Sequence, residues 1–312
     1  MQPKNILILS CNTGEGHNSS AKALKNTIES EGIKCTLYDT SSLISDDFSR
    51  GVSDIYNYSV RSPLFSTAYK IAEWYSNLTV KPKSPIYLMN RSYIDKLYKL
   101  IKDDNYDVVI TVHLFAALSM TSLREKYHLR IPTYFVATDY TTYPFLEETH
   151  LDGYMIAHPH LKELYMRQGI PERIIYSTGI PCMEGKLISR VQKNDARKLL
   201  DELYEWNLKS YTGRWFLIMG GSMGYGNMME IVSSLERKCS HDDKILCVCG
   251  RNHKEKEKLD KRYGSSDVVK VIGFTDKIPL MMDACDLLCS KPGGLTSTEA
   301  LIKNIPLIHT KP

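Results

Sequence analysis

Short runs of apolar residues recur along the chain and alternate with longer segments in which apolar residues stand three or four positions apart. The short runs predict buried strands, and the longer segments predict helices that cover them. This alternation predicts an α/β protein with parallel sheets covered on both faces. The predicted strands before the last helix are Asn5–Ser10, Ile33–Tyr38, Tyr106–Val112, Pro132–Ala137, Gly153–Ala157, Ile174–Ser177, Arg214–Met219, Lys244–Cys249, Val268–Ile272 and Asp286–Ser290.

The chain is long for a single hydrophobic core, since 312 residues suggest two domains. The sequence Thr178-Gly179-Ile180-Pro181 marks a plausible linker between them. We therefore expect one Rossmann-like domain over residues 1–178 and a second over residues 179–312. Both halves have a glycine-rich loop after a strand, and this predicts a nucleotide in the cleft between them.

The first glycine loop is Asn12-Thr13-Gly14-Glu15-Gly16-His17, and a helix is predicted from about Asn18 to Ser30. A dinucleotide fingerprint would have a third glycine where this chain has Ser19, so the signal for NAD is weak. His17 lies where the loop meets the helix, and the helix dipole should lower its pKa and keep it neutral. A neutral histidine there can act as a general base, although a loop histidine is more often structural.

A second polar cluster, Thr138-Asp139-Tyr140, follows the strand predicted at Pro132–Ala137. Asp139 can orient a base or accept the proton of an acceptor substrate. It can also cap the following turn, which is the commonest role of an aspartate in such a place.

Two glycine loops in the second half follow predicted strands, Gly220–Gly224 and Pro292–Gly294, and a helix is predicted at Thr296–Lys303. Unpaired amide groups at a helix N-terminus favour a diphosphate. Glu299, about one turn into the helix, can accept hydrogen bonds from a ribose diol, although it can also be a favourable first-turn charge after a tight turn. The chain has neither a Gly-Lys-Ser/Thr P-loop nor an Asp-x-Asp metal pair, so we expect amides and helix dipoles to hold the diphosphate.

Composition limits the class of protein. With 43% hydrophobic and 24% charged residues, the chain has the composition of a globular protein. No apolar run is long enough to cross a bilayer, and the N-terminal sequence passes into the glycine loop without a signal cleavage site. The eight cysteines lack CxxC spacing, so we expect reduced thiols in a protein kept in the cytosol.

Positive charge is concentrated between Phe48 and Lys102, where nine Lys or Arg residues accompany three acids and ten aromatic residues. Such a surface suits an anionic membrane interface. A solvated helix face over an aromatic core is the alternative, and nucleic-acid binding is the least favoured. The residues expected to contact the membrane are Arg61, Phe65, Trp74, Lys81, Lys83 and Arg91.

Together these motifs resemble the glycosyltransferase family that includes monogalactosyldiacylglycerol synthase, the bacterial diacylglycerol glucosyltransferases and, more distantly, the lipid I N-acetylglucosaminyltransferase. The resemblance extends over nearly the whole chain. It implies a two-domain GT-B fold, with a UDP-sugar held mainly by the second domain and a diacylglycerol-type acceptor reached from the membrane by the first. The motifs that carry it are NILILSCNTGEGHNSSAKAL, VATDY, STGIP, IMGGSMGYGN, VCGRN and GFTDKIPLMMDACDLLCSKPGGLTSTEALIKNIPLIHT.

Carried over residue by residue, the resemblance implies that His17 is the catalytic loop histidine and Glu299 the ribose-binding acid. Asp139 is expected to orient His17 or to act as the base itself. Phe274 belongs to the turn that faces the uracil. The other residues expected to contact the UDP-sugar are Gly16, Gly221, Ser222, Gly293, Gly294, Leu295 and Thr296.

The expected reaction is direct, inverting transfer of glucose or galactose from UDP to a hydroxyl of diacylglycerol or of a glycosyl-diacylglycerol. We expect no metal or other cofactor, no nucleic acid, and a peripheral location on the cytoplasmic face of the cell membrane. Two alternatives stay open. One is an NAD-type oxidoreductase with Asp39 on the ribose, and the other is a non-catalytic nucleotide-sugar-binding protein at the membrane.

The chain ends at Lys311-Pro312, whereas the family it resembles continues with a further donor-contacting segment and C-terminal helices. We therefore expect the second domain to be incomplete, as in a fragment or an incomplete homologue.

Overall fold

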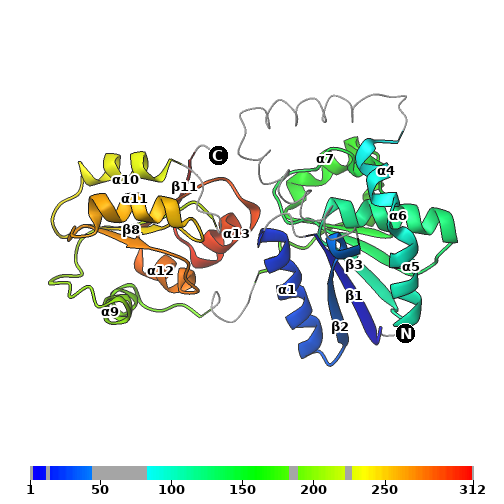
Figure 1. Ribbon diagram of the computed structural model, residues 1–312, viewed down its shortest axis with the longest axis horizontal. Helices are drawn as coiled ribbons and strands as arrows, with labels where there is room; N and C mark the ends of the chain where they lie inside the picture. Colours follow the sequence, from blue (N-terminus) through cyan, green and yellow to red (C-terminus); the bar gives the residue numbers. More distant parts are fainter. Residues whose placement is uncertain (1–2, 12–14, 44–82, 183–188, 222–226, 311–312) are drawn as a thin grey trace. The chain divides into compact units, whose positions relative to one another are not determined.

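The computed structural model describes residues 3–11, 15–43, 83–182, 189–221 and 227–310. The chain divides into two compact units, Met1–Cys182 and Met183–Pro312, whereas the sequence suggested a division between residues 178 and 179. Each unit contains a parallel sheet with helices packed against it (Figure 1). The α/β class and the two parallel sheets expected from the sequence are confirmed.

The sheet of the first unit has the strand order β2-β1-β3-β4-β5-β6, and all its strands run parallel. Its strands are β1 (Asn5–Ser10), β2 (Lys34–Asp39), β3 (Val108–Thr111), β4 (Thr133–Val136), β5 (Gly153–Ile156) and β6 (Ile175–Ser177). Its α-helices are α1 (Glu15–Ser30), α4 (Pro85–Arg91), α5 (Ile94–Asp103), α6 (Leu114–Tyr127) and α7 (Lys162–Arg167).

Strand β1 shows why an apolar run folds in this way. Leu7 and Leu9 are buried in the core formed with α4, α5 and α6. Ile6 and Ile8 alternate with them and pack with Ala21 of α1 in a separate core. Because successive side chains of a strand point to opposite faces, a strand covered on both sides needs apolar residues at every position.

The sheet of the second unit has the strand order β11-β10-β7-β8-β9 and is also parallel. Its strands are β7 (Trp215–Met219), β8 (Lys244–Val248), β9 (Val269–Ile272), β10 (Leu287–Ser290) and β11 (Leu307–His309). Its α-helices are α9 (Lys193–Tyr204), α10 (Met228–Glu236), α11 (His253–Tyr263), α12 (Ile278–Ala284) and α13 (Gly294–Lys303).

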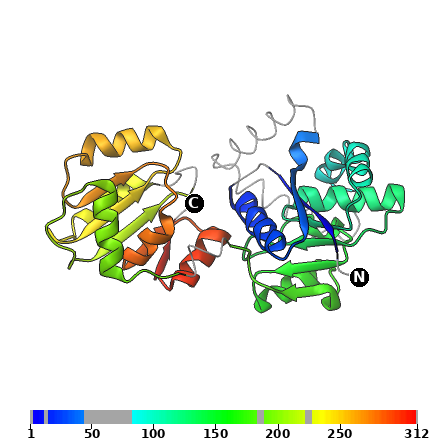
Figure 2. The ribbon, with the colours of Figure 1, turned by 90° about the horizontal axis from the view of Figure 1, so that it is seen from below.

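The helices of the second unit form a layer on each face of its sheet (Figure 2). Leu217 of β7 packs in a core with residues of α9, α12 and α13. Its neighbour Ile218 packs in a different core with residues of α10 and α11. The two faces of β7 are therefore covered by different helices, as in other open parallel sheets.

Helix boundaries differ slightly from those expected. Helix α1 begins at Glu15 rather than near Asn18, and α13 begins at Gly294 rather than at Thr296. Both helices therefore begin within the glycine-rich sequences, because glycine carries no side chain that opposes the tight entry into a first turn. Two of the three glycine loops of the sequence analysis, the first and the last, thus contribute the first turn of a helix.

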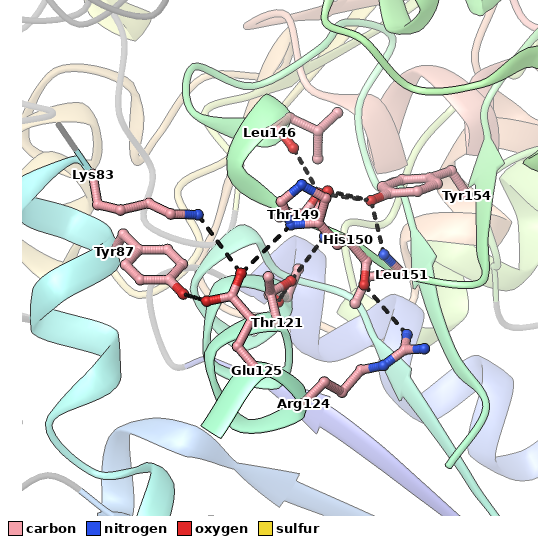
Figure 3. A network of polar contacts seen from close by, with 11 residues as sticks. Lys83, Tyr87, Thr121, Arg124, Glu125, Leu146, Thr149, His150, Leu151 and Tyr154 are labelled. Carbon is pink, nitrogen blue, oxygen red and sulfur yellow. Dashed lines mark hydrogen bonds and ion pairs between the residues drawn. The ribbon is translucent and has the colours of Figure 1, made fainter. Parts of the chain in front are cut away.

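A polar network joins α4 to α6 and to the loop before β5 (Figure 3). The Tyr87 hydroxyl donates a hydrogen bond of 2.6 Å to Glu125, and Lys83 Nζ lies 3.8 Å from the same carboxylate. Ser84, the N-cap of α4, donates from its amide and its hydroxyl to the buried Glu148, at 2.8 and 2.6 Å. These contacts fix the start of α4 on the unit.

An apolar cavity of about 330 Å³ lies on the α1 side of the first sheet. Its walls combine one helix residue, four strand residues and the segment after β6. They are Leu24, Ile110, Tyr134, Val136, Met155 and Thr178–Pro181.

Candidate active site

The strand order reverses once in each sheet, and each reversal marks a place where ligands bind. From β1 the chain passes to β2 on one side and later to β3 on the other. From β7 it passes to β8 on one side and later to β10 on the other. Ligands of open parallel sheets bind outside the carboxyl ends of the strands at such reversals. His17 lies at the first reversal, and Gly221, Gly293 and Gly294 lie at the second, whereas Asp139 follows β4 and Phe274 follows β9.

In the first unit, His17 lies in the first turn of α1 after β1, and His113 follows β3 as the N-cap of α6. Their rings meet edge to face with centroids 4.7 Å apart. His17 was predicted from the sequence, and His113 was not. A signal for His113 was present, because it directly follows the strand predicted at Tyr106–Val112.

The hydrogen bonds of His17 define its tautomer. Its Nδ1 lies 3.0 Å from the carbonyl oxygen of Val112 and 2.7 Å from Oγ1 of Thr138. A carbonyl oxygen can only accept, so Nδ1 carries the proton in the neutral ring. The lone pair is then on Nε2, and this nitrogen is the one that can accept a proton from a substrate.

Burial lowers the pKa of His17, and the negative charge of Asp139 and the Val112 carbonyl oppose this shift. The imidazole is therefore neutral at pH 7. The sequence analysis expected the same direction from the dipole of α1, whereas desolvation is the largest cause in the structure. The pKa of His113 is lowered further, by burial and by the neighbouring His17.

Asp139 is linked to His17 through two hydroxyl groups. The Tyr143 hydroxyl donates to Asp139 Oδ2 at 2.8 Å, and it lies 3.4 Å from Thr138 Oγ1. Thr138 Oγ1 in turn contacts His17 Nδ1. Burial and the charge of Asp139 raise the pKa of Tyr143 well above its ordinary value, so the phenol stays protonated and keeps donating. Asp139 thus acts on His17 through its charge and through this chain of contacts.

In the second unit, the loops after β7 and β10 lie side by side because these strands are neighbours in the sheet. Gly221 has φ +72°, a left-handed conformation that favours glycine. Gly293 is the N-cap of α13 and Gly294 its first residue. The structure therefore brings Gly221, Gly293 and Gly294 to one edge, together with Leu295 and Thr296 of the first turn of α13.

The hydroxyls of Ser297 and Thr298 each bond the carbonyl four residues earlier, at 2.8 Å. The N-cap residue Gly293 has no side chain to cap the first amide groups of α13, so these groups can bind an anion. The helix has ten residues, long enough for its dipole to favour negative charge at this end.

Glu299 is half-buried in α13, and burial raises its pKa to about 7. Within the described residues its carboxylate has no hydrogen-bond partner, so a ligand that donates to it would find it free. Phe274, after β9, is 63% exposed, and the Arg251 guanidinium lies 5.0 Å from the centre of its ring. An exposed aromatic ring with a cation over it offers a surface for a flat base.

Several expected site residues lie outside the described residues, namely Ser222, Arg61, Phe65, Trp74 and Lys81. Gly16 is exposed in the first turn of α1. Lys83 is exposed just before the N-cap of α4 and Arg91 is exposed at its last residue, but Lys83 also faces Glu125 and the ring of Tyr87. Among the described residues, no cluster of His, Cys, Asp or Glu is placed to hold a metal ion, and no helix is long and apolar enough to cross a bilayer.

Solved structures share this fold over almost the whole chain. MurG of Acinetobacter baumannii matches with a TM-score of 0.60 at 14% identity, over 99% of this chain and 79% of its own. HepE of Anabaena in complex with UDP matches with a TM-score of 0.56 at 14% identity, over 98% and 80%. The two units therefore form the GT-B fold, and the resemblance drawn from the motifs is confirmed in this respect.

Sequence comparison gives the family. The profile of monogalactosyldiacylglycerol (MGDG) synthase matches residues 17–182, and that of the glycosyltransferase family 28 C-terminal domain matches residues 216–310. The chain belongs to the MGDG synthase family of glycosyltransferases. Its relatives include the processive diacylglycerol beta-glucosyltransferase of Bacillus cereus (strain G9842), 27% identical over 98% of this chain and 76% of the relative. That of Bacillus mycoides (strain KBAB4) is 26% identical with the same coverage.

Proposed function

We propose that this protein is an inverting glycosyltransferase that moves glucose or galactose from a UDP-sugar to a hydroxyl of diacylglycerol or of a glycosyl-diacylglycerol. The observation that carries the proposal is the arrangement of His17. Its Nδ1 is bound to a carbonyl oxygen at the strand-order reversal, which leaves Nε2 to accept a proton. Membership of a glycosyltransferase family and the names of the relatives support the choice of reaction and acceptor.

In the proposed step, the acceptor oxygen forms a bond to the anomeric carbon while its proton passes to Nε2 of His17. The bond between that carbon and the β-phosphate oxygen breaks, and its electron pair leaves with UDP. An alcohol is a poor nucleophile at neutral pH, so a positioned base contributes roughly a hundred- to ten-thousand-fold to the rate. Asp139 stabilises the imidazolium that forms, because its charge raises the pKa of His17.

The donor is proposed to bind at the second-unit site. The amide groups at the start of α13 and the Gly221 turn face the diphosphate, Glu299 accepts from the ribose hydroxyls, and Phe274 lies beside the uracil. Glycine at 221 lets the backbone approach a phosphate closely. That a protein of the same fold, HepE, was crystallised with UDP supports this assignment.

The acceptor is proposed to be reached at an anionic membrane surface, with the protein peripheral on the cytoplasmic face. Helix α4 supports this, because Leu88 is 56% exposed near the exposed cation Arg91. An exposed apolar side chain beside a cation suits a lipid headgroup region.

The NAD-type alternative is weakened by Asp39, which would have to hold the ribose. Its Oδ1 already accepts from the amide and the hydroxyl of Ser41, at 2.9 and 2.7 Å. The non-catalytic alternative differs from the proposal only in making no product, so an activity measurement separates the two.

The test is transfer of radiolabelled sugar from UDP-glucose and UDP-galactose to diacylglycerol in vesicles, followed by separation of the lipids. We expect labelled glycosyl-diacylglycerol from one of the two donors. His17→Ala should abolish most of the signal, whereas the matched control His150→Ala, at an exposed histidine before β5, should not. A folded wild-type protein that forms no glycolipid from either donor would contradict the proposal.

A further inference from the structure

Lys291 directly follows β10 and precedes the glycine turn into α13. Its side chain lies against the turn after β7, because a Cβ built on Gly221 would stand 3.1 Å from Lys291 Cε and 3.7 Å from its Nζ. Ser290 is paired with Met219 in the parallel register of these two strands. The ammonium group of Lys291 therefore lies at the strand-order reversal of the second unit.

This ammonium group has no acid and no hydrogen-bond acceptor within the part of the chain that the structure describes. Burial lowers its pKa, and no neighbouring charge contributes to the shift. Other buried lysines of the unit are paired: Lys303 bonds Asp283, and Lys244 bonds the carbonyl oxygens of His241 and Asp243. A partly buried cation without a counter-charge is costly, so the position favours a bound anion.

The groups around Lys291 suit the same kind of ligand. The Oγ of Ser290 is buried, with the residue 1% exposed, and it makes no hydrogen bond among the described residues. The first amide groups of α13 begin three residues further on, at Gly294. A cation, an unpartnered buried hydroxyl and a helix N-terminus at one strand end are what a phosphate group needs from a protein.

We propose that Lys291 binds the diphosphate of the donor and stabilises the charge of the departing UDP. The inference rests on the proposed function and adds a residue to the donor site. When the bond from the anomeric carbon to the β-phosphate oxygen breaks, the electron pair stays on that oxygen, and the adjacent ammonium group balances the new charge. The sequence analysis assigned this task to amides and helix dipoles alone, whereas Lys291 supplies a full positive charge without a metal.

Calorimetric titration of the full chain with UDP, UMP and uridine tests the assignment. Lys291→Met should weaken UDP binding about tenfold or more and UMP binding less, and it should leave uridine binding unchanged, because uridine has no phosphate. Lys291→Arg keeps the charge and should restore most of the UDP affinity. The matched control Lys258→Met, at a lysine 69% exposed in α11, removes the same charge and should bind all three ligands as the wild type does.

Equal losses for UDP and uridine in Lys291→Met would show a merely structural role and would overturn the inference, as would unchanged UDP affinity. A wild-type protein that binds neither UDP nor uridine would instead overturn the proposed function. In that case the role of Lys291 is tested by acylating the protein with and without inorganic pyrophosphate. Mass spectrometry then measures how fast Lys291 is labelled. Slower labelling with pyrophosphate supports an oxyanion site at Lys291, and equal labelling overturns it.

Discussion

His17 has one nitrogen committed to the protein and one available to a substrate. The Nδ1 contact with Val112 fixes the ring, so its reactivity depends on whether Nε2 is free of a proton. Since burial lowers the pKa of His17 below its ordinary value of 6.5, the ring loses its proton at a lower pH than a free histidine. This protonation determines where activity falls as the pH is lowered.

We expect the midpoint of the acid limb of kcat/KM to lie below pH 6.5, because protonation of Nε2 removes the base. His17→Ala should lower the transfer rate by roughly a hundred-fold or more at pH 7, with little change in UDP affinity. The measurements are initial rates from pH 5 to 8 and a UDP titration. An acid limb above pH 6.5, or near-normal turnover of His17→Ala, would move the assignment to Asp139.

The pKa of Glu299 is raised, whereas that of His17 is lowered. Its pKa of about 7 in the folded protein lies above the ordinary value of 4.5, so the native state binds more protons than the unfolded state between these values. Stability should therefore fall as pH rises through this window. Glu299→Gln removes the effect and should be more stable than the wild type at pH 8 by about 1 to 3 kcal/mol, with the difference vanishing below pH 4.5.

Urea unfolding of both proteins at pH 4.5 and pH 8 measures this difference. The same substitution should weaken UDP binding by about 1.5 to 3 kcal/mol, since it removes a charged hydrogen-bond acceptor from the proposed ribose site. A variant that gains stability and keeps its UDP affinity would leave Glu299 as a strained helix residue outside the site.

At the scale of elements, α12 and α13 are joined by a buried ion pair. Lys303 Nζ lies 2.7 Å from Asp283 Oδ2, with the two side chains 0% and 4% exposed. The same ammonium bonds the carbonyl oxygen of Ser189. Because α13 carries Glu299 and follows the glycine turn, this pair holds the helix on which the proposed donor site depends.

Lys303→Met should destabilise the second unit by about 3 to 5 kcal/mol, because it leaves the buried carboxylate of Asp283 without its counter-charge and bonded only to the amide of Val191 at 3.3 Å among the described residues. Adding Asp283→Asn should recover part of the loss. Tryptophan fluorescence during urea unfolding reports on this unit through the fully buried Trp215. Lys198→Met, at a lysine 58% exposed in α9, is the surface control. A loss no larger than that of the control would mean that the pair contributes nothing to stability.

Elements that depend on local pattern were predicted well, because an apolar run such as Asn5–Ser10 needs only its own residues to define a buried strand. The environment of His17 was not predicted. Val112 and Thr138 reach it because β3 lies beside β1 and β4 beside β3, and the sequence does not state this order. Lys291 was missed for a related reason. Its importance lies in lacking a partner among the residues that the structure describes, and partners are decided by the fold.

At the scale of the whole molecule, the buried clusters of the described residues divide between the two units. Those containing Leu7 and Ile8 belong wholly to the first unit, and those containing Leu217 and Ile218 belong wholly to the second. Each unit thus has its own core, which is the condition for independent folding.

We expect residues 1–182 and 183–312, produced separately, to show cooperative thermal unfolding at temperatures near those of two transitions in the full chain. Circular dichroism and calorimetry measure both. If either piece alone lacks a cooperative transition while the full chain unfolds in one step, the two units depend on each other for stability.

The proposed membrane docking also belongs to the scale of the whole molecule. Lys83→Ser with Arg91→Ser should lower affinity for anionic vesicles by up to ~2 kcal/mol, since each basic residue near such a surface contributes about 1 kcal/mol. The difference should shrink with added salt, because the field is screened over about 8 to 10 Å. Vesicle sedimentation at two salt concentrations measures it, and a double variant that sediments like the wild type would remove α4 from the docking surface.

The cavity on the α1 side of the first sheet has a consequence for handling the protein in solution. Its walls are almost entirely hydrocarbon and aromatic, from Leu24 to Pro181. An apolar hollow of this kind takes up environment-sensitive dyes and promotes self-association as concentration rises. The native chain should therefore enhance the fluorescence of anilinonaphthalene sulfonate before any heating, and mild detergent should suppress both the dye signal and the light scattering of concentrated samples.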